Sequence, residues 1–217
     1  MSNYRIILPL FLSLIVFSHS SVAGSEIKDE LSDGLRYSFN NPRYLFAVGA
    51  IIGLSQFDKE VQSCSRQHPL PRLLDRFGDN YGKGLNYILA SGVIWLDRGK
   101  SRHELTRRWR HMTEAYTANA LATLILKKAS HRYRPDHSNR HSFPSGHTSS
   151  SFCTAAFLYG RQGRITGSIG YALAALTGYQ RLQANKHWWS DVLAGGLLGQ
   201  LVGKGFKIGR ASCRERV

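Results

Sequence analysis

The sequence predicts an all-α fold, a single-domain bundle of about six core helices. The length of 217 residues suits one domain. Hydrophobic residues make up 42% of the chain and aromatic residues 11%, which is enough for a packed core despite a formal net charge of +15. The apolar residues gather in Ala-, Leu- and Gly-rich blocks of helical length. Three cysteines without a CxxC pair argue against a disulfide-rich scaffold.

Residues 1–23 have the pattern of a secretory signal peptide. Arg5 supplies the positive charge, residues 6–17 form an apolar run, and residues 21–23 (SVA) form a small-residue cleavage site. We therefore expect an exported, periplasmic protein of bacterial type, with association to the membrane as a further expectation. The alternative is an uncleaved anchor, because no charged residue follows this run until Glu26.

Six apolar blocks predict the helices, in order along the chain. They cover residues 44–57, 84–96, 115–126, 148–159, 165–179 and 188–206. Most of their charge-free runs are shorter than the ~20 residues that span a bilayer, which favours a soluble bundle. The last ten residues, 208–217, match one reading frame of a widely used sequencing adapter, so we interpret them as a non-native tail after a domain over residues 24–207.

Basic connectors are expected between the blocks, at residues 97–111 and 131–143. Pro135 and Pro144 interrupt the second connector, which predicts a loop between a helix that ends near Lys128 and a helix that begins near Ser145. The excess of Lys and Arg suggests an anionic partner. Nucleic acid is disfavoured, because the aromatic residues lie in the apolar blocks and do not alternate with the basic runs.

Two clusters of polar residues lie around the second connector. Lys127 and Arg134 are two cations that would converge on one anion. Ser145, Gly146 and His147 begin the next helix, where a serine caps, a glycine lets a ligand approach the backbone, and free amides hold phosphate oxygens. A basic helix end and a plain capped helix start are the simpler alternatives.

A third cluster contains Arg181, His187 and Asp191. If the helix begins at Lys186, His187 and Asp191 are four residues apart on one helix face. The carboxylate would then accept a hydrogen bond from one imidazole nitrogen and leave the other nitrogen as a nucleophile. The alternative is an exposed His–Asp pair on a helix surface.

Together the clusters resemble the three motifs of the type 2 phosphatidic acid phosphatase superfamily. The motifs read K-x6-RP at residues 127–135, PSGH at residues 144–147 and R-x5-H-x3-D at residues 181–191. The match spans about 65 residues, and the helical blocks fit the all-helical core of that family. Gln180 departs from the family pattern, which usually has Ser there, and we expect this position to be peripheral to phosphate chemistry.

The resemblance implies a metal-independent phosphatase with a phosphate site at the helix ends and a phosphohistidine intermediate. His187 is implied as the nucleophile, Asp191 as the group that holds its tautomer, and His147 as the acid and then the base. The implied phosphate-binding residues are Lys127, Arg134, Ser145, Gly146 and Arg181. No metal or cofactor is expected, and the substrate would be a phosphorylated lipid, a lipid pyrophosphate or a small phosphomonoester.

Other interpretations use the same residues differently. A vanadate-dependent haloperoxidase would share the phosphate pocket, although the chain is short for one. A non-enzymatic protein would bind anionic membranes through Arg107, Arg108 and Arg110. A zinc hydrolase would need a histidine set whose spacings do not match the usual ligand pairs. That set is His131, His137, His141 and His147. After export, Cys64 and Cys153 would form a disulfide, or Cys153 would be a buried thiol.

Overall fold

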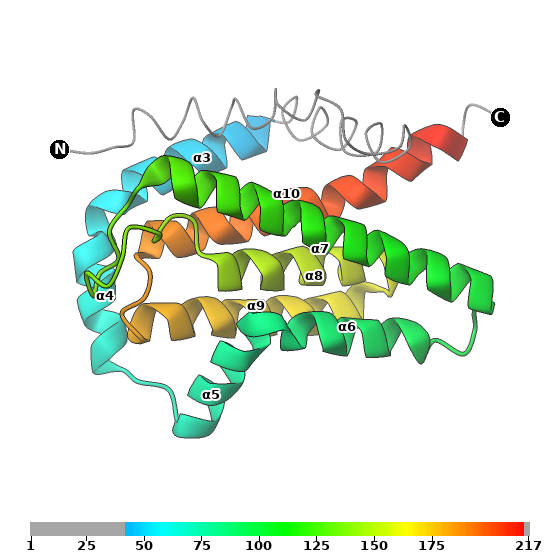
Figure 1. The fold of residues 1–217 in the computed structure, drawn as a ribbon, viewed down its shortest axis with the longest axis horizontal. Helices are drawn as coiled ribbons and strands as arrows, with labels where there is room; N and C mark the ends of the chain where they lie inside the picture. Colours follow the sequence, from blue (N-terminus) through cyan, green and yellow to red (C-terminus); the bar gives the residue numbers. More distant parts are fainter. Residues whose placement is uncertain (1–41, 215–217) are drawn as a thin grey trace.

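A computed structural model describes residues 42–214, and Figure 1 shows their arrangement. All regular secondary structure in this part of the chain is helical, which confirms the all-α prediction. The helices are α3 (Pro42–Leu54), α4 (Asp58–Gln67), α5 (Arg72–Asn80), α6 (Asn86–Trp95), α7 (Arg102–Ser130), α8 (Gly146–Arg161), α9 (Arg164–Gln183) and α10 (Trp189–Arg214). The expected signal segment, residues 1–23, lies outside the described residues, and the expected tail overlaps the end of α10.

Helix α8 lies at the centre of the bundle, between α7 and α10 on one side and α9 on the other (Figure 1). Its sequence is small and apolar, and residues from Thr148 to Leu158 are buried on several sides of the helix. Phe157 packs in a core that also contains Ile94 of α6 and Met112 of α7. Because this central helix is buried on several sides, it holds the residues of its first turn rigidly.

Glycines allow α8 and α10 to lie close together. A Cβ atom at Gly195 would fall 2.5 Å from the carbonyl oxygen of Ser145, and Cβ atoms at Gly199 and Gly203 would overlap the α8 backbone in the same way. These glycines recur every four residues, so they share one face of α10. The close approach fixes the beginning of α10 against the beginning of α8.

Each of the six expected helices is present, but the expected connector over residues 97–111 is wrong. Helix α7 begins at Arg102, after a Ser101 hydroxyl that accepts a hydrogen bond from the Glu104 amide at 3.2 Å. A serine followed three residues later by a glutamate is the pattern of a helix start. Arg108 then binds Glu104 one turn earlier at 2.6 Å, which supports the basic helix further.

Helices α4 and α5 were not expected, because their sequences are polar and contain no apolar block. The turn η2 (Tyr81–Leu85) leads from α5 into α6, and Gly84 has a φ of 130° there, which favours glycine. A Cβ atom at Gly82 would lie 2.6 Å from the Cβ atom of His147. This turn therefore packs directly against the PSGH segment.

The helices between residues 42 and 214 include none with the length and apolarity needed to cross a membrane. Cys64 is exposed and Cys153 is buried in the core. Both are free thiols, so they do not form the disulfide that was one of the two alternatives.

Candidate active site

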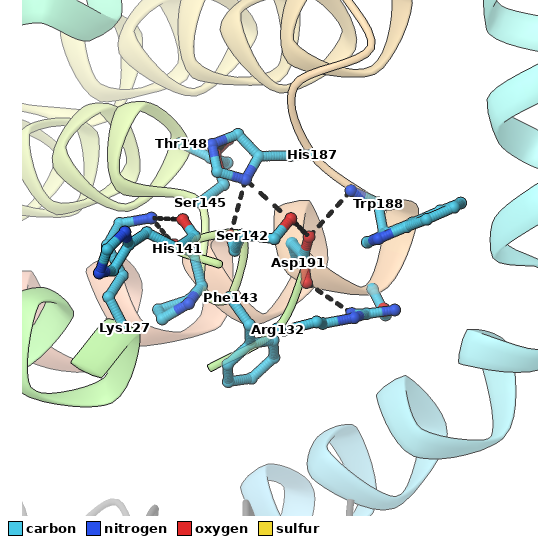
Figure 2. Close-up of polar contacts among 12 residues, drawn as sticks. Lys127, Arg132, His141, Ser142, Phe143, Ser145, Thr148, His187, Trp188 and Asp191 are labelled. Atoms are coloured by element: carbon cyan, nitrogen blue, oxygen red, sulfur yellow. Dashed lines mark hydrogen bonds and ion pairs between the residues drawn. The ribbon is translucent and has the colours of Figure 1, made fainter. Parts of the chain in front are cut away.

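The three sequence clusters meet at one end of the bundle, where α7 ends, α8 begins and the chain passes from α9 into α10. The Ser145 amide donates a hydrogen bond to the carbonyl oxygen of Asp191 at 3.0 Å, which joins the starts of α8 and α10. The Lys127 ammonium donates to the carbonyl oxygens of His141 at 2.8 Å and Pro144 at 2.7 Å, which ties the end of α7 to the same loop. Figure 2 shows these contacts around His187.

Lys127 is held by the loop and lies in a cationic environment. Burial, and then the charge of Arg134, lower the pKa of Lys127 from its ordinary 10.5 to about 8. An ammonium group has three N–H donors, and the two carbonyl contacts leave one for a ligand. The Nε atom of Arg134 is buried and has no hydrogen-bond partner among the described residues. An anion beside these two cations would meet an unsatisfied donor.

Ser145 and Gly146 occupy the start of α8, as the motif predicts. Ser145 is at the N-cap position, but its hydroxyl makes no capping bond to the described backbone and instead pairs with the Thr148 hydroxyl at 2.9 Å. The expected capping contact is therefore replaced by a pair of hydroxyls. A Cβ atom at Gly146 would lie 3.6 Å from the Cε atom of Lys127, so the backbone there approaches the cation closely.

His187 does not lie on a helix with Asp191, contrary to the expectation. Helix α10 begins at Trp189, and His187 lies in the bend before it. Its Nδ1 atom is 2.7 Å from the carbonyl oxygen of Ser142 and 3.9 Å from Asp191 Oδ2. Because a carbonyl only accepts, Nδ1 carries the proton and Nε2 carries the lone pair. Burial lowers the pKa of His187 to about 4, so the ring is neutral at pH 7.

Asp191 organises the segment that carries His187. Its Oδ2 atom accepts hydrogen bonds from the Trp188 amide at 2.9 Å and the Ser142 hydroxyl at 2.5 Å, and Oδ1 accepts from Arg132 at 2.5 Å. The bond from the residue just before the helix to a side chain in its first turn is half of a capping box. Burial alone would raise the pKa of Asp191, but His187 and Arg132 lower it, so the carboxyl is ionised.

His147 stands in the first turn of α8 with a buried Nε2 atom that has no hydrogen-bond partner among residues 42–214. The Oδ1 atom of Asp79 on α5 lies 3.8 Å from this Nε2 atom. Burial, Arg181 and His187 lower the pKa of His147 to about 3, which leaves the ring neutral until a negative charge arrives. A dianion bound there would favour the protonated ring.

Arg181, near the end of α9, is held from two sides. Asp79 accepts a bond from its guanidinium, and the Gln180 side chain accepts from its Nε atom at 2.6 Å. Gln180 also donates to Asp75 on α5 at 2.9 Å. Gln180 is therefore not peripheral, because it links Arg181 to the helix that covers the site.

The zinc interpretation is not supported by the placement of the histidines. No group of three or more His, Cys, Asp or Glu side chains that could hold a metal ion occurs among the described residues. His131, His137 and His141 are exposed in the loop after α7, whereas His147 begins α8.

Four site residues were not identified from the sequence as such: Asp58, Asp79, Arg132 and Ser142. Arg132 lies between the residues of the first motif, and Ser142 lies just before the second. Asp58 and Asp79 lie on α4 and α5, which the sequence did not predict as helices. The proximity of Arg132 to Arg134 was the one sequence signal that pointed to any of them.

Comparison with protein families identifies the chain. The model of the PAP2 superfamily matches residues 108–211, a range that contains all three motifs. The chain belongs to the PAP2 superfamily. Within the curated members, a lipid A 1-phosphatase of Porphyromonas gingivalis is 42% identical over 76 residues, which is 34% of this chain and 17% of that protein. A PA-phosphatase related-family protein of Dictyostelium discoideum is 30% identical over 134 residues, which is 49% of each chain.

Two solved PAP2 structures have the same fold. LpxE of Aquifex aeolicus is 25% identical, with a TM-score of 0.55 over 68% of this chain and 93% of that chain. A transmembrane PAP2-type phosphatidylglycerolphosphate phosphatase of Bacillus subtilis is 21% identical, with a TM-score of 0.56 over 79% of this chain and 92% of that chain. The chain spans about half or less of the curated relatives that it matches.

Proposed function

We propose that this PAP2 protein is a metal-independent phosphatase that acts through a phosphohistidine at His187. The observation that carries the proposal is the state of the His187 ring. Its Nδ1 proton is bound to the Ser142 carbonyl, so the lone pair is on Nε2, in the field of Lys127 and Arg134. A neutral imidazole beside fixed cations suits attack on a phosphoryl group. The cations attract the anionic substrate, and their charge disfavours protonation of the ring, so the Nε2 lone pair stays available.

In the first step the Nε2 lone pair of His187 attacks phosphorus, and the bond from phosphorus to the leaving oxygen breaks with its electron pair on that oxygen. His147 donates a proton to the leaving group. In the second step water attacks phosphorus while His147 takes a proton from it. The N–P bond then breaks, its electron pair returns to Nε2, and inorganic phosphate leaves. Asp191 keeps the Nδ1 proton in place indirectly, because it binds Ser142, whose carbonyl accepts that proton.

The phosphoryl oxygens would be bound by the cationic groups and by the start of α8. Lys127, Arg134 and Arg181 supply positive charge, and the Arg134 Nε atom has no other hydrogen-bond partner among the described residues. The Ser145 hydroxyl and the Gly146 amide complete the set. These donors stabilise the charge that is redistributed over the oxygens in the transition state.

The substrate that we propose is a phosphorylated lipid, because the curated relative with 42% identity is a lipid A 1-phosphatase. Exposed Arg107 and Arg110 on α7 would contact anionic head groups, although Arg110 also pairs with Glu114 at 3.6 Å. Arg108 is largely buried and binds Glu104 and Asp97, so it is unsuited to that role. We further propose that the protein is exported by residues 1–23 and acts in the periplasm through a domain over residues 24–207.

Hydrolysis of a chromogenic phosphomonoester tests the proposal. Wild type should turn over equally well with and without EDTA, and His187→Ala should lose at least about a thousandfold in kcat. His137→Ala is the matched control, because it removes an exposed histidine of the nearby loop. Unchanged turnover in His187→Ala would contradict the nucleophile, and loss of activity with EDTA would contradict metal independence.

A substrate panel separates lipid from soluble substrates. We expect phosphatidic acid in anionic vesicles and a prenyl pyrophosphate to be hydrolysed with a higher kcat/KM than the small ester. The preference for vesicles should fall at higher salt, because exposed charges are screened. Equal kcat/KM for all substrates at both salt concentrations would contradict the lipid proposal and leave the phosphatase proposal intact.

A further inference from the structure

A buried bridge of opposite charges lies behind the site, on the side of Asp191 away from His187. The Arg132 guanidinium donates from Nη1 to Asp191 Oδ1 at 2.5 Å and from Nη2 to Asp58 Oδ2 at 2.6 Å. Asp58 lies at the first turn of α4, and its side chain is 7% exposed. One guanidinium thus joins two buried carboxylates that come from different helices.

Asp58 also holds the beginning of α10. Its Oδ1 atom accepts the Ser190 amide at 2.8 Å, and its Oδ2 atom accepts the Ser190 hydroxyl at 2.8 Å. The first turn of a helix has amides without partners inside the helix, and here a carboxylate from another helix satisfies one of them. Arg132 completes the triangle by donating to the Ser190 hydroxyl at 2.8 Å.

We propose that Asp58 and Arg132 are positioning residues for the nucleophile, acting through Asp191. Asp191 holds Trp188 and Ser142, and Ser142 supplies the carbonyl that binds His187 Nδ1. A displacement of Asp191 would therefore reach His187 through the backbone of the neighbouring Trp188 and through Ser142. The hydrogen bonds of this bridge run to Asp191 and Ser190, so we expect the bridge to act on the position of His187 and not on phosphate binding.

The charge balance explains why the bridge must be complete. Two buried carboxylates with a single guanidinium between them are stable only while each keeps its hydrogen bonds. In Asp58→Asn an amide donor replaces one acceptor, so either Arg132 or Ser190 loses a partner. Loss of either contact weakens the bridge that fixes Asp191, and a shift of about 1 Å at the reacting group costs up to roughly a hundredfold in rate.

The inference rests on the proposed phosphatase activity, and the test compares Asp58→Asn with Glu60→Gln. Glu60 is an exposed acid in the same first turn of α4, so its substitution removes the same charge without touching the bridge. We expect Asp58→Asn to lower kcat roughly tenfold to a hundredfold, with KM and the Kd for inorganic phosphate changed by less than about twofold. Glu60→Gln should match wild type in every measurement.

Arg132→Lys is a second variant, because it keeps one charge but cannot reach both carboxylates at once. It should reproduce the loss of kcat and the unchanged Kd for phosphate. If Asp58→Asn or Arg132→Lys turns over like wild type, or weakens phosphate binding in proportion to kcat, the positioning role is wrong. Thermal unfolding of each variant confirms that the compared proteins are folded.

A measurement without turnover keeps the two proposals apart. In the NMR spectrum, the Nδ1 proton of His187 should give a strongly shifted signal because it is bound to the Ser142 carbonyl. This signal should move or broaden in Asp58→Asn and stay unchanged in Glu60→Gln. If wild type hydrolyses no phosphoester, the proposed function fails. An unchanged signal in Asp58→Asn contradicts the positioning role.

Discussion

The Lys127 ammonium group has a structural role, and we propose that it also has a functional one. It fixes the loop after α7 through two carbonyl contacts, and it would supply a positive charge to the phosphoryl group. Burial and Arg134 hold the pKa of Lys127 at about 8, well below its ordinary value. The charge is therefore present at neutral pH and lost as the pH rises through about 8.

This shift predicts a pH-dependent affinity for inorganic phosphate. Above pH 8 the Kd of wild type should rise by up to about tenfold per pH unit, because the free protein must first take up a proton on Lys127. Lys127→Arg stays charged and should not show this added loss. Calorimetric titration between pH 6 and about 10 measures both proteins. Parallel Kd curves for the two proteins would show that Lys127 does not carry the charge.

For individual residues, sequence patterns could predict the motif residues but not the contacts that hold them. The spacing of His187 and Asp191 suggested a direct bond on one helix, yet the Ser142 carbonyl takes the Nδ1 proton instead. Local spacing cannot show this, because Ser142 is 45 residues away along the chain. Asp58 is still further from Ser190, by 132 residues.

Helices α8 and α10 are positioned by their glycines. The first turns of both helices contribute to the site, and the Ser145 amide binds the Asp191 carbonyl directly. A methyl group on the α10 face would push the helices apart and would move His147 relative to His187. The glycine spacing was visible in the sequence, but its partner helix was not.

Gly199→Ala should therefore destabilise the fold. A Cβ atom there would overlap the backbone of Ser149 and Cys153, and overpacking of this kind costs about 1–3 kcal/mol. Gly92→Ala on α6 is the matched control, because a Cβ atom at Gly92 meets nothing within 4 Å. Alanine there should be neutral or stabilise by up to about 1 kcal/mol. Chemical denaturation measures both free energies of unfolding, and equal values would contradict the close packing of α8 and α10.

For the molecule as a whole, the sequence predicted the all-α fold and the six core helices, because their apolar blocks are periodic and long. It failed where helices are polar, as in α4, α5 and the first turns of α7. Those helices form because they pack on the bundle and bind its charged residues, as Asp58 binds Arg132 and Asp79 binds Arg181. Asp58 and Asp79 lie on these polar helices, so the sequence did not predict their contacts with the site.

The arrangement of the molecule places a neutral, buried histidine between the cations of α7 and α9 and the start of α8. We propose that part of the charge excess serves the phosphoryl group there, through Lys127, Arg134 and Arg181. The central claim is that His187 accepts the phosphoryl group covalently. This claim concerns a chemical bond, so it is tested by isolating that bond.

The most direct measurement is to mix the protein with a phosphate-labelled substrate, quench with alkali within the first turnover, and locate the label by mass spectrometry. We predict an alkali-stable, acid-labile phosphoryl group on the peptide that contains His187, and none in His187→Ala. A label on another residue, or rapid turnover by wild type with no trapped phosphoryl group at any quench time, would contradict the account.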